Sequence, residues 1–250
     1  MTTAQSERTR LRWWREVLYI LAFYAVYTAI RNTQGSANVS AEHALHNAKR
    51  VIRVEHLTGM FHEATIQHWF IHDRFFLQFW DVFYGSAHFI VTAVAIIYMF
   101  RKMPSRYPLW RNTLACTTAL ALIGFATWPL MPPRLLPPNY HFVDTLKVYG
   151  GLWNFDSGAM QKISNQYAAM PSLHFAWSSW CALVLGPAIK RPWLKVLMYA
   201  YPFITLFAIV VTANHYILDA VGGAVVLAIG FLLGRVITTF LARRHQLRVP

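Results

Sequence analysis

The sequence is poor in charged residues, in acidic residues and in cysteine. Charged residues make up 13% of its 250 residues, whereas soluble globular proteins contain about 25%. The two cysteines, Cys116 and Cys181, both fall within apolar runs, so neither a disulfide framework nor a thiolate metal centre is indicated. Aspartate and glutamate number only 10 against 23 lysines and arginines. A soluble domain and a disulfide-stabilised secreted scaffold are therefore excluded.

Apolar residues are abundant, at 56% of the chain, and they gather in long runs. A helix needs about 20 apolar residues to cross a hydrocarbon core of roughly 30 Å. The sequence predicts an all-α, polytopic membrane helix bundle that forms a single membrane domain over residues 1–250. The six predicted transmembrane spans are residues 17–30, 79–100, 114–130, 173–189, 196–211 and 217–240.

The first of these runs is short and has two interpretations. Its 14 residues match the apolar part of a signal peptide, and the small residues over 36–41 match a cleavage site. Trp13 and Trp14 lie beside a cluster of arginines, as in the interfacial belt of a retained span. We favour a retained span, with residues 1–16 as a cytoplasmic tail.

The basic residues follow the topology of the predicted spans. Fifteen of the 23 lie in the N-terminal tail, in 101–111, in 190–195 and in 235–248, which are alternate ends of the spans. This is the positive-inside pattern, which places both termini in the cytoplasm and 31–76 and 131–171 on the extracytoplasmic side. The net charge of +13 is thereby explained without a nucleic-acid partner.

The outside segment 31–76 carries apolar residues at roughly helical spacing among charged ones. This spacing predicts helices that either lie on the outer leaflet as interfacial helices or pack against the bundle. The apolar positions are Val51, Ile52, Val54, Leu57, Phe61, Ile66, Trp69 and Phe70.

Three ionisable residues stand at the outer ends of predicted spans: His174 at the start of the fourth, and His215 and Asp219 at the start of the sixth. Ionisable groups at membrane depth are costly and mark functional sites, although paired core histidines are the alternative. A spacing of four lets the Asp219 carboxylate hold one imidazole nitrogen of His215. The other nitrogen is then free to act as a nucleophile, and His174 can supply a proton.

Both histidines are preceded by residues that favour helix starts. Ser172 and Asn214 are common N-cap residues, so two helix N-termini are expected to face one outer site. Unpaired N–H groups at helix N-termini attract anions such as phosphate. Arg134, held near the membrane by a proline-rich segment, would add bidentate recognition.

Two stretches resemble a known family. The segments Ala169-Met170-Pro171-Ser172-Leu173-His174 and Asn214-His215-Tyr216-Ile217-Leu218-Asp219 are similar to the second and third motifs of the type 2 phosphatidic acid phosphatase superfamily. The resemblance covers residues 127–223. The Pro-Ser-Leu-His form is more similar to the branch that contains the inositol phosphorylceramide synthases.

The resemblance implies a mechanism without metal or cofactor. His215 would attack phosphorus and form a phosphohistidine, Asp219 would orient it, and His174 would protonate the leaving oxygen. Arg134 and Ser172 would hold the phosphoryl oxygens. The substrate would be a lipid phosphate or phospholipid, and the acceptor an alcohol or water.

The chain departs from the family pattern at two expected cations. Thr127 stands where the first motif has lysine, and Ala208-Ile209 stands where the third motif has Ser-Arg. Arg31, Lys147 and Lys162 are possible substitutes, and we favour Arg31.

Other functions remain open on the sequence alone. A lipid phosphatase or pyrophosphatase would use the same site with water as the acceptor. Asp81 and His88 within a span are compatible with a membrane carrier, and the missing cations with a non-catalytic lipid-binding protein. Histidine pairs at 43/46 and 68/72 have metal-binding spacing, but His62-Glu63 lacks the second histidine of the zinc-protease motif, and no metal is expected.

Overall fold

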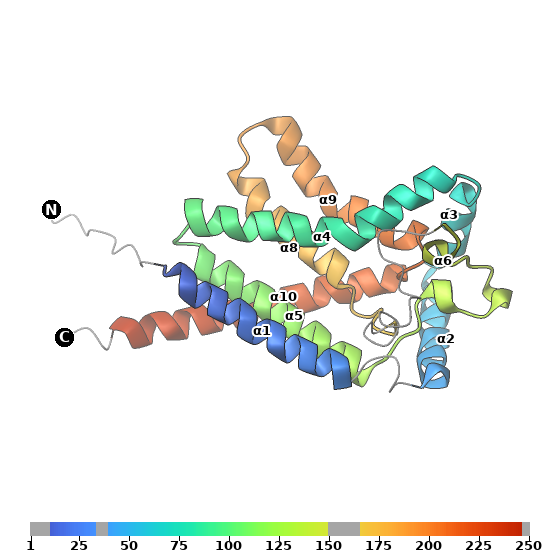
Figure 1. Ribbon diagram of the computed structural model, residues 1–250, viewed down its shortest axis with the longest axis horizontal. Coiled ribbons are helices and arrows are strands. Elements are labelled where there is room, and N and C mark those ends of the chain that lie inside the picture. The colour runs from blue at the N-terminus through green and yellow to red at the C-terminus, as the bar shows by residue number, and fades with distance from the viewer. Residues whose placement is uncertain (1–10, 34–39, 150–165, 247–250) are drawn as a thin grey trace.

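The computed structural model describes residues 11–33, 40–149 and 166–246, and in these ranges the chain is helical and contains no strand. Five long helices form the body of the molecule (Figure 1). They are α1 (Trp13–Thr33), α4 (Arg74–Lys102), α5 (Tyr107–Thr127), α9 (Pro192–Val211) and α10 (Ile217–Gln246).

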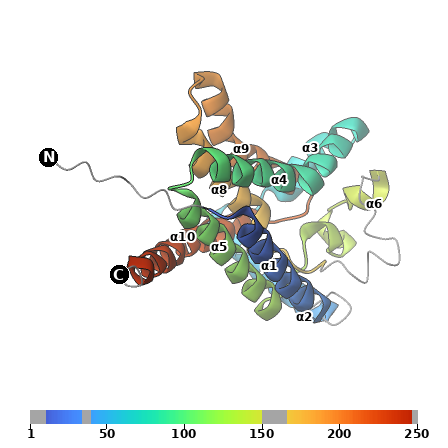
Figure 2. The same cartoon turned by 60° about the vertical axis from the view of Figure 1, so that its left-hand side comes forward.

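The start of α1 and the end of α10 lie at one end of the body (Figures 1 and 2). The opposite end carries the short helices α2 (Ala41–Thr58), α3 (Glu63–Phe70) and α6 (Thr145–Tyr149). Helix α2 runs crosswise to α5 and α10 at that end (Figure 1). The turn that leads into α10 is at this end too, so the two ends of the molecule differ in architecture.

Helix α8 (Leu173–Leu185) is the central helix of the bundle. It packs against α4, α5, α9 and α10. Trp180 is fully buried and donates its indole N–H to the carbonyl of Trp110 at 3.0 Å. The indole of Trp177 donates to the hydroxyl of Thr118 at 3.1 Å. Satisfied indoles of this kind fix α8 rotationally, which matters because His174 lies in its first turn.

Helices α5 and α10 pack along one another at close range. Gly230 and Gly234 of α10 lie one turn apart and face Thr117 and Thr113 of α5. A Cβ atom at Gly234 would come within 2.8 Å of the Thr113 backbone nitrogen, so only glycine allows this approach. Small residues four apart are typical of closely packed membrane helices.

Some of the apolar residues predicted to form a stripe in segment 31–76 are buried, and others are exposed. Val51 and Ile52 of α2 are buried against the segment around Leu130 and Met131. Leu57 and Trp69, by contrast, are 81% and 72% exposed. The segment is helical, as predicted, and packing accounts for only part of its apolar surface. The interfacial placement of these helices is not confirmed.

Three helices of the described part are long and apolar enough to cross a membrane: α4, α9 and the portion Ile217–Arg244 of α10. The prediction of six spans is therefore confirmed only in part. The predicted fourth span, 173–189, contains the α8 helix of 13 residues, which ends at Gly186 and continues as a 3₁₀ turn, Gly186–Ala188. At 1.5 Å per residue, α8 is about 20 Å long, short of a hydrocarbon core.

We expect the Gly230→Ala substitution to destabilise the protein because its Cβ would meet the Thr117 backbone. Overpacking of this kind costs about 1–3 kcal/mol. The measurement is the apparent Tm of the detergent-solubilised protein. Ala228→Leu, at an exposed position of the same helix, is the control and should leave the Tm nearly unchanged. Equal Tm values for wild type and Gly230→Ala would contradict the packing described here.

Candidate active site

Two helix ends meet at the end of the bundle that carries α2 and α3. The N–H of Ser172, the N-cap of α8, donates to the carbonyl of Asp219 in the first turn of α10 at 2.9 Å. The Ser172 hydroxyl accepts from the N–H of Phe175, as an N-cap residue does. Gly223 makes the approach possible, since a Cβ there would lie 2.5 Å from the Ser172 carbonyl oxygen. The two candidate histidines are brought together by this contact.

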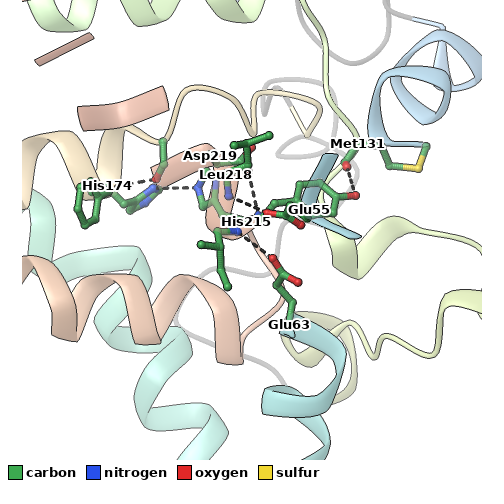
Figure 3. A network of polar contacts seen from close by, with 11 residues as sticks. Glu55, Glu63, Met131, His174, His215, Leu218 and Asp219 are labelled. Atoms are coloured by element: carbon green, nitrogen blue, oxygen red, sulfur yellow. Dashed lines mark hydrogen bonds and ion pairs between the residues drawn. The ribbon is translucent and has the colours of Figure 1, made fainter. Parts of the chain in front are cut away.

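His215, Asp219 and His174 form a continuous chain of hydrogen bonds (Figure 3). His215 Nδ1 lies 3.1 Å from Asp219 Oδ2, which is the contact predicted from the four-residue spacing. His215 Nε2 lies 3.3 Å from His174 Nδ1. With the Asp219 carboxylate accepting from Nδ1–H, Nε2 of His215 carries the lone pair and accepts from His174. The aspartate thus sets the tautomer that a histidine nucleophile requires.

Two residues of α4 complete the surroundings of His174. The ring of Tyr84 stacks on His174 with centroids 4.2 Å apart, and the ring of His88 meets His174 edge-on at 4.1 Å. His88 Nδ1 lies 3.0 Å from the Tyr84 carbonyl oxygen. Tyr84 and His88 are four residues apart, and this spacing is the only sequence signal that places both on one helix face.

Arg134 reaches the same region from the proline-rich segment. Its backbone N–H donates to the carbonyl of Ala213, two residues before His215, at 2.8 Å. Its guanidinium pairs with Asp144 at 2.9 Å, and the arginine side chain is only 9% exposed. Nε of Arg134 is buried and has no acceptor in the described structure. A buried guanidinium N–H without an acceptor is the donor that an incoming anion would satisfy.

The N-terminus of α10 differs from the prediction. The helix begins at Ile217, and the Asn214 amide donates to the carbonyl and hydroxyl of Thr212, so the prediction that Asn214 caps this helix is wrong. The N–H groups of Tyr216, Ile217 and Leu218 all donate to carboxyl oxygens. They are consequently not available to a phosphate, in contrast to the prediction for this helix end.

Sequence reasoning missed Glu55 and Glu63, the residues that supply two of those carboxyl oxygens. Glu63 Oε1 accepts from Ile217 N–H at 2.9 Å, and Glu55 Oε1 accepts from Leu218 N–H at 2.7 Å. Both side chains are fully buried although they lie in the outside segment. The sequence signal is weak: Glu55 shares a helix face with the buried Val51 and Ile52, whereas the other buried residue of α3 beside Glu63 is the polar Gln67.

The suggested substitutes for the missing cations are not brought into the site by the described structure. The side chain of Arg31 and all of Lys162 lie outside the described residues. Lys147 is in α6 and exposed. In the described part of the chain, no three histidine, cysteine, aspartate or glutamate side chains are grouped as metal ligands would be.

The chain matches one family model. The model of the PAP2 superfamily matches residues 49–233, which include both motifs as well as Glu55 and Glu63. The chain belongs to the PAP2 superfamily, whose members are phosphatases and phosphotransferases acting on lipid-like phosphates. Neither the curated proteins nor the solved structures contain a match.

We expect the Gly223→Ala substitution to abolish most activity, because the new methyl group would push the Ser172 carbonyl away from α10. A displacement of about 1 Å at reacting groups can reduce a rate by roughly 100-fold. The neighbouring Gly222→Ala is the matched control, since its Cβ would find its nearest atom at 3.3 Å. Turnover of a labelled lipid phosphate by both variants is the measurement. Similar rates for the two variants would contradict the requirement for close approach.

Proposed function

We propose that this protein is an integral membrane phosphotransferase that moves a phosphate-containing group to or from a lipid through a phosphohistidine at His215. The observation that carries the proposal is the buried Asp219–His215–His174 chain of hydrogen bonds. Membership of the PAP2 superfamily supports the general class of reaction. The form Pro171-Ser172-Leu173-His174 favours the synthase-like branch, in which an alcohol is the acceptor.

In the first step His215 Nε2 attacks phosphorus and the bond from phosphorus to the leaving oxygen breaks. His174 gives its Nδ1 proton to that oxygen, and Asp219 stabilises the positive charge that develops on His215. In the second step His174 takes a proton from the incoming hydroxyl, which attacks the phosphohistidine. Both steps balance in protons, because His174 returns to its starting state.

The resting distance of 3.3 Å between His215 and His174 leaves no space for a phosphoryl group between them. Substrate binding must therefore separate the two rings, so that the His174 N–H turns from His215 Nε2 to the leaving oxygen. Arg134 supports this step, since its unsatisfied Nε offers a donor beside the His215 turn. Ser172 and the start of α8 would contribute further donors to the phosphoryl oxygens.

For the placement in the membrane, we propose six spans, with both termini cytoplasmic and the site on the extracytoplasmic side. The start of α1 and the end of α10 lie at the end of the molecule opposite α2 and α3 (Figure 1), and the N–H of Leu218 near His215 binds Glu55 of α2. The exposed Leu57 and Trp69 would then lie in the outer leaflet interface, as residues of interfacial helices do.

A lipid phosphatase or pyrophosphatase is the second candidate, because water could take the place of the alcohol at the same site. The buried histidine chain does not distinguish these acceptors.

The His215→Ala variant should lose turnover of labelled phospholipids and polyprenyl phosphates by at least about 1000-fold, as expected when a nucleophile is removed. It should also lose the acid-labile phosphoprotein that wild type forms. The exposed His72→Ala is the control and should retain both signals. Undiminished turnover by His215→Ala would overturn the proposed mechanism.

A separate prediction concerns the acceptor. With a labelled lipid substrate, we expect wild type to transfer the labelled group to an added alcohol, and the yield of transfer product to rise with alcohol concentration. Release of inorganic phosphate alone, whatever alcohol is offered, would exclude the transferase and leave the phosphatase with the same site residues.

A further inference from the structure

The first turn of α10 is held by carboxyl groups from three helices (Figure 3). Asp219 of α10 itself accepts from Tyr216 N–H, Glu63 of α3 accepts from Ile217 N–H, and Glu55 of α2 accepts from Leu218 N–H. All three carboxyl-bearing residues are 0% exposed. N–H groups in the first turn of a helix have no backbone acceptor within the helix, so the two glutamates replace the water that would otherwise solvate Ile217 and Leu218.

The two glutamates bind neighbouring backbone N–H groups, those of Ile217 and Leu218, at 2.9 and 2.7 Å. Oε2 of Glu55 and Oε2 of Glu63 are buried and have no hydrogen-bond donor among the described residues. A proton on one carboxyl group would give the other a donor. Two neighbouring buried carboxylates would otherwise repel one another, because little water screens them.

Among the described residues, no lysine or arginine forms an ion pair with Glu55 or Glu63. In the described part of the chain, the ion pairs are Arg111–Glu16, Arg134–Asp144 and His215–Asp219. The other ionisable groups that face the pair are Asp219 and Tyr216 of α10, and an ionised Asp219 adds a further negative charge. Burial, followed by the charge of Glu63, raises the pKa of Glu55 to about 9. A proton shared by the two carboxyl groups would therefore serve as their counter-charge.

The clamp formed by Glu55 and Glu63 acts on the reacting groups through one helical turn. Leu218 is adjacent to Asp219, whose Oδ2 holds His215 and whose carbonyl holds the start of α8. A shift of this turn would move His215 relative to His174. We propose that Glu55 and Glu63 share one proton and are positioning residues, which fix the backbone of the first turn of α10 and so the position from which His215 faces His174. The proposal rests on the proposed function.

Substitution of the glutamates by glutamine distinguishes two roles: sharing a proton, and only accepting from the backbone N–H groups of α10. Glu55→Gln and Glu63→Gln each leave one carboxylate to accept from the new amide, and Oε1 still caps the backbone N–H. The double variant Glu55→Gln/Glu63→Gln places two amide N–H groups against each other, so one side chain must turn away and release α10. The exposed Glu42→Gln on α2 is the control.

We expect each single variant to keep kcat within about twofold of wild type at pH 7, and the double variant to lose at least about 100-fold in kcat with KM nearly unchanged. The assay uses the panel lipid that wild type turns over fastest. A fully active double variant, or single variants as impaired as the double, would overturn the proposal. If His215→Ala is inactive and the double variant is active, the positioning role of Glu55 and Glu63 is refuted, whereas the proposed function is not.

The pH profile gives a second readout that a purely structural role would not move. Because the folded protein needs the shared proton, activity should fall as pH rises through about 9, the pKa of Glu55. Glu55→Gln cannot lose its amide proton at this pH, so its alkaline limb should move upward by at least about one unit. An unchanged alkaline limb would overturn proton sharing even if the double variant does not fold.

A third readout requires no turnover. Diethyl pyrocarbonate modifies exposed imidazoles, and mass spectrometry of the intact protein's digest measures the rate at His215 relative to the exposed His43. The double variant should show at least about tenfold faster modification of His215, while Glu55→Gln should match wild type. Equal rates in all variants would refute the clamp whether or not the lipid assay detects an enzyme.

Discussion

The site depends on one backbone contact, the hydrogen bond from the Ser172 N–H to the Asp219 carbonyl at 2.9 Å. It joins the first turn of α8 to the first turn of α10, and these turns carry or adjoin the two histidines. The contact is possible because Gly223 has no side chain at the point of approach. The distances among His174, His215 and Asp219 follow from it, since both helices are otherwise fixed by buried packing.

Several ionisable side chains with little solvent exposure lie around that contact, and most of them face another ionisable group. Asp219 faces His215, Asp144 faces Arg134, and Glu55 faces Glu63. Buried charges are costly unless they are paired or neutralised, so such an arrangement restricts where a substrate anion can enter. The unsatisfied Nε of Arg134 is an exception on the cationic side, which is why we assign the phosphate to its neighbourhood.

Much of this organisation could be predicted from local patterns. The spacing of His215 and Asp219 indicated their contact, the N-cap role of Ser172 followed from its position before an apolar run, and the apolar composition indicated a helical membrane protein. The Glu55 and Glu63 contacts could not be predicted, because they join residues 163 and 154 positions apart. Helix periodicity predicts contacts between residues a few positions apart and not between residues so widely separated in the sequence. Likewise, the length of α8 was overestimated because an apolar run does not reveal where Gly186 and Pro187 end a helix.

The clamp has a consequence for the order in which the molecule assembles. Ribosomes deliver α2 and α3 more than 150 residues before the backbone N–H groups that their glutamates bind. Until α10 has been synthesised and has docked, neither glutamate can bind these backbone N–H groups. The chain of hydrogen bonds from Asp219 to His174 therefore forms only after α10 joins the helices that precede it.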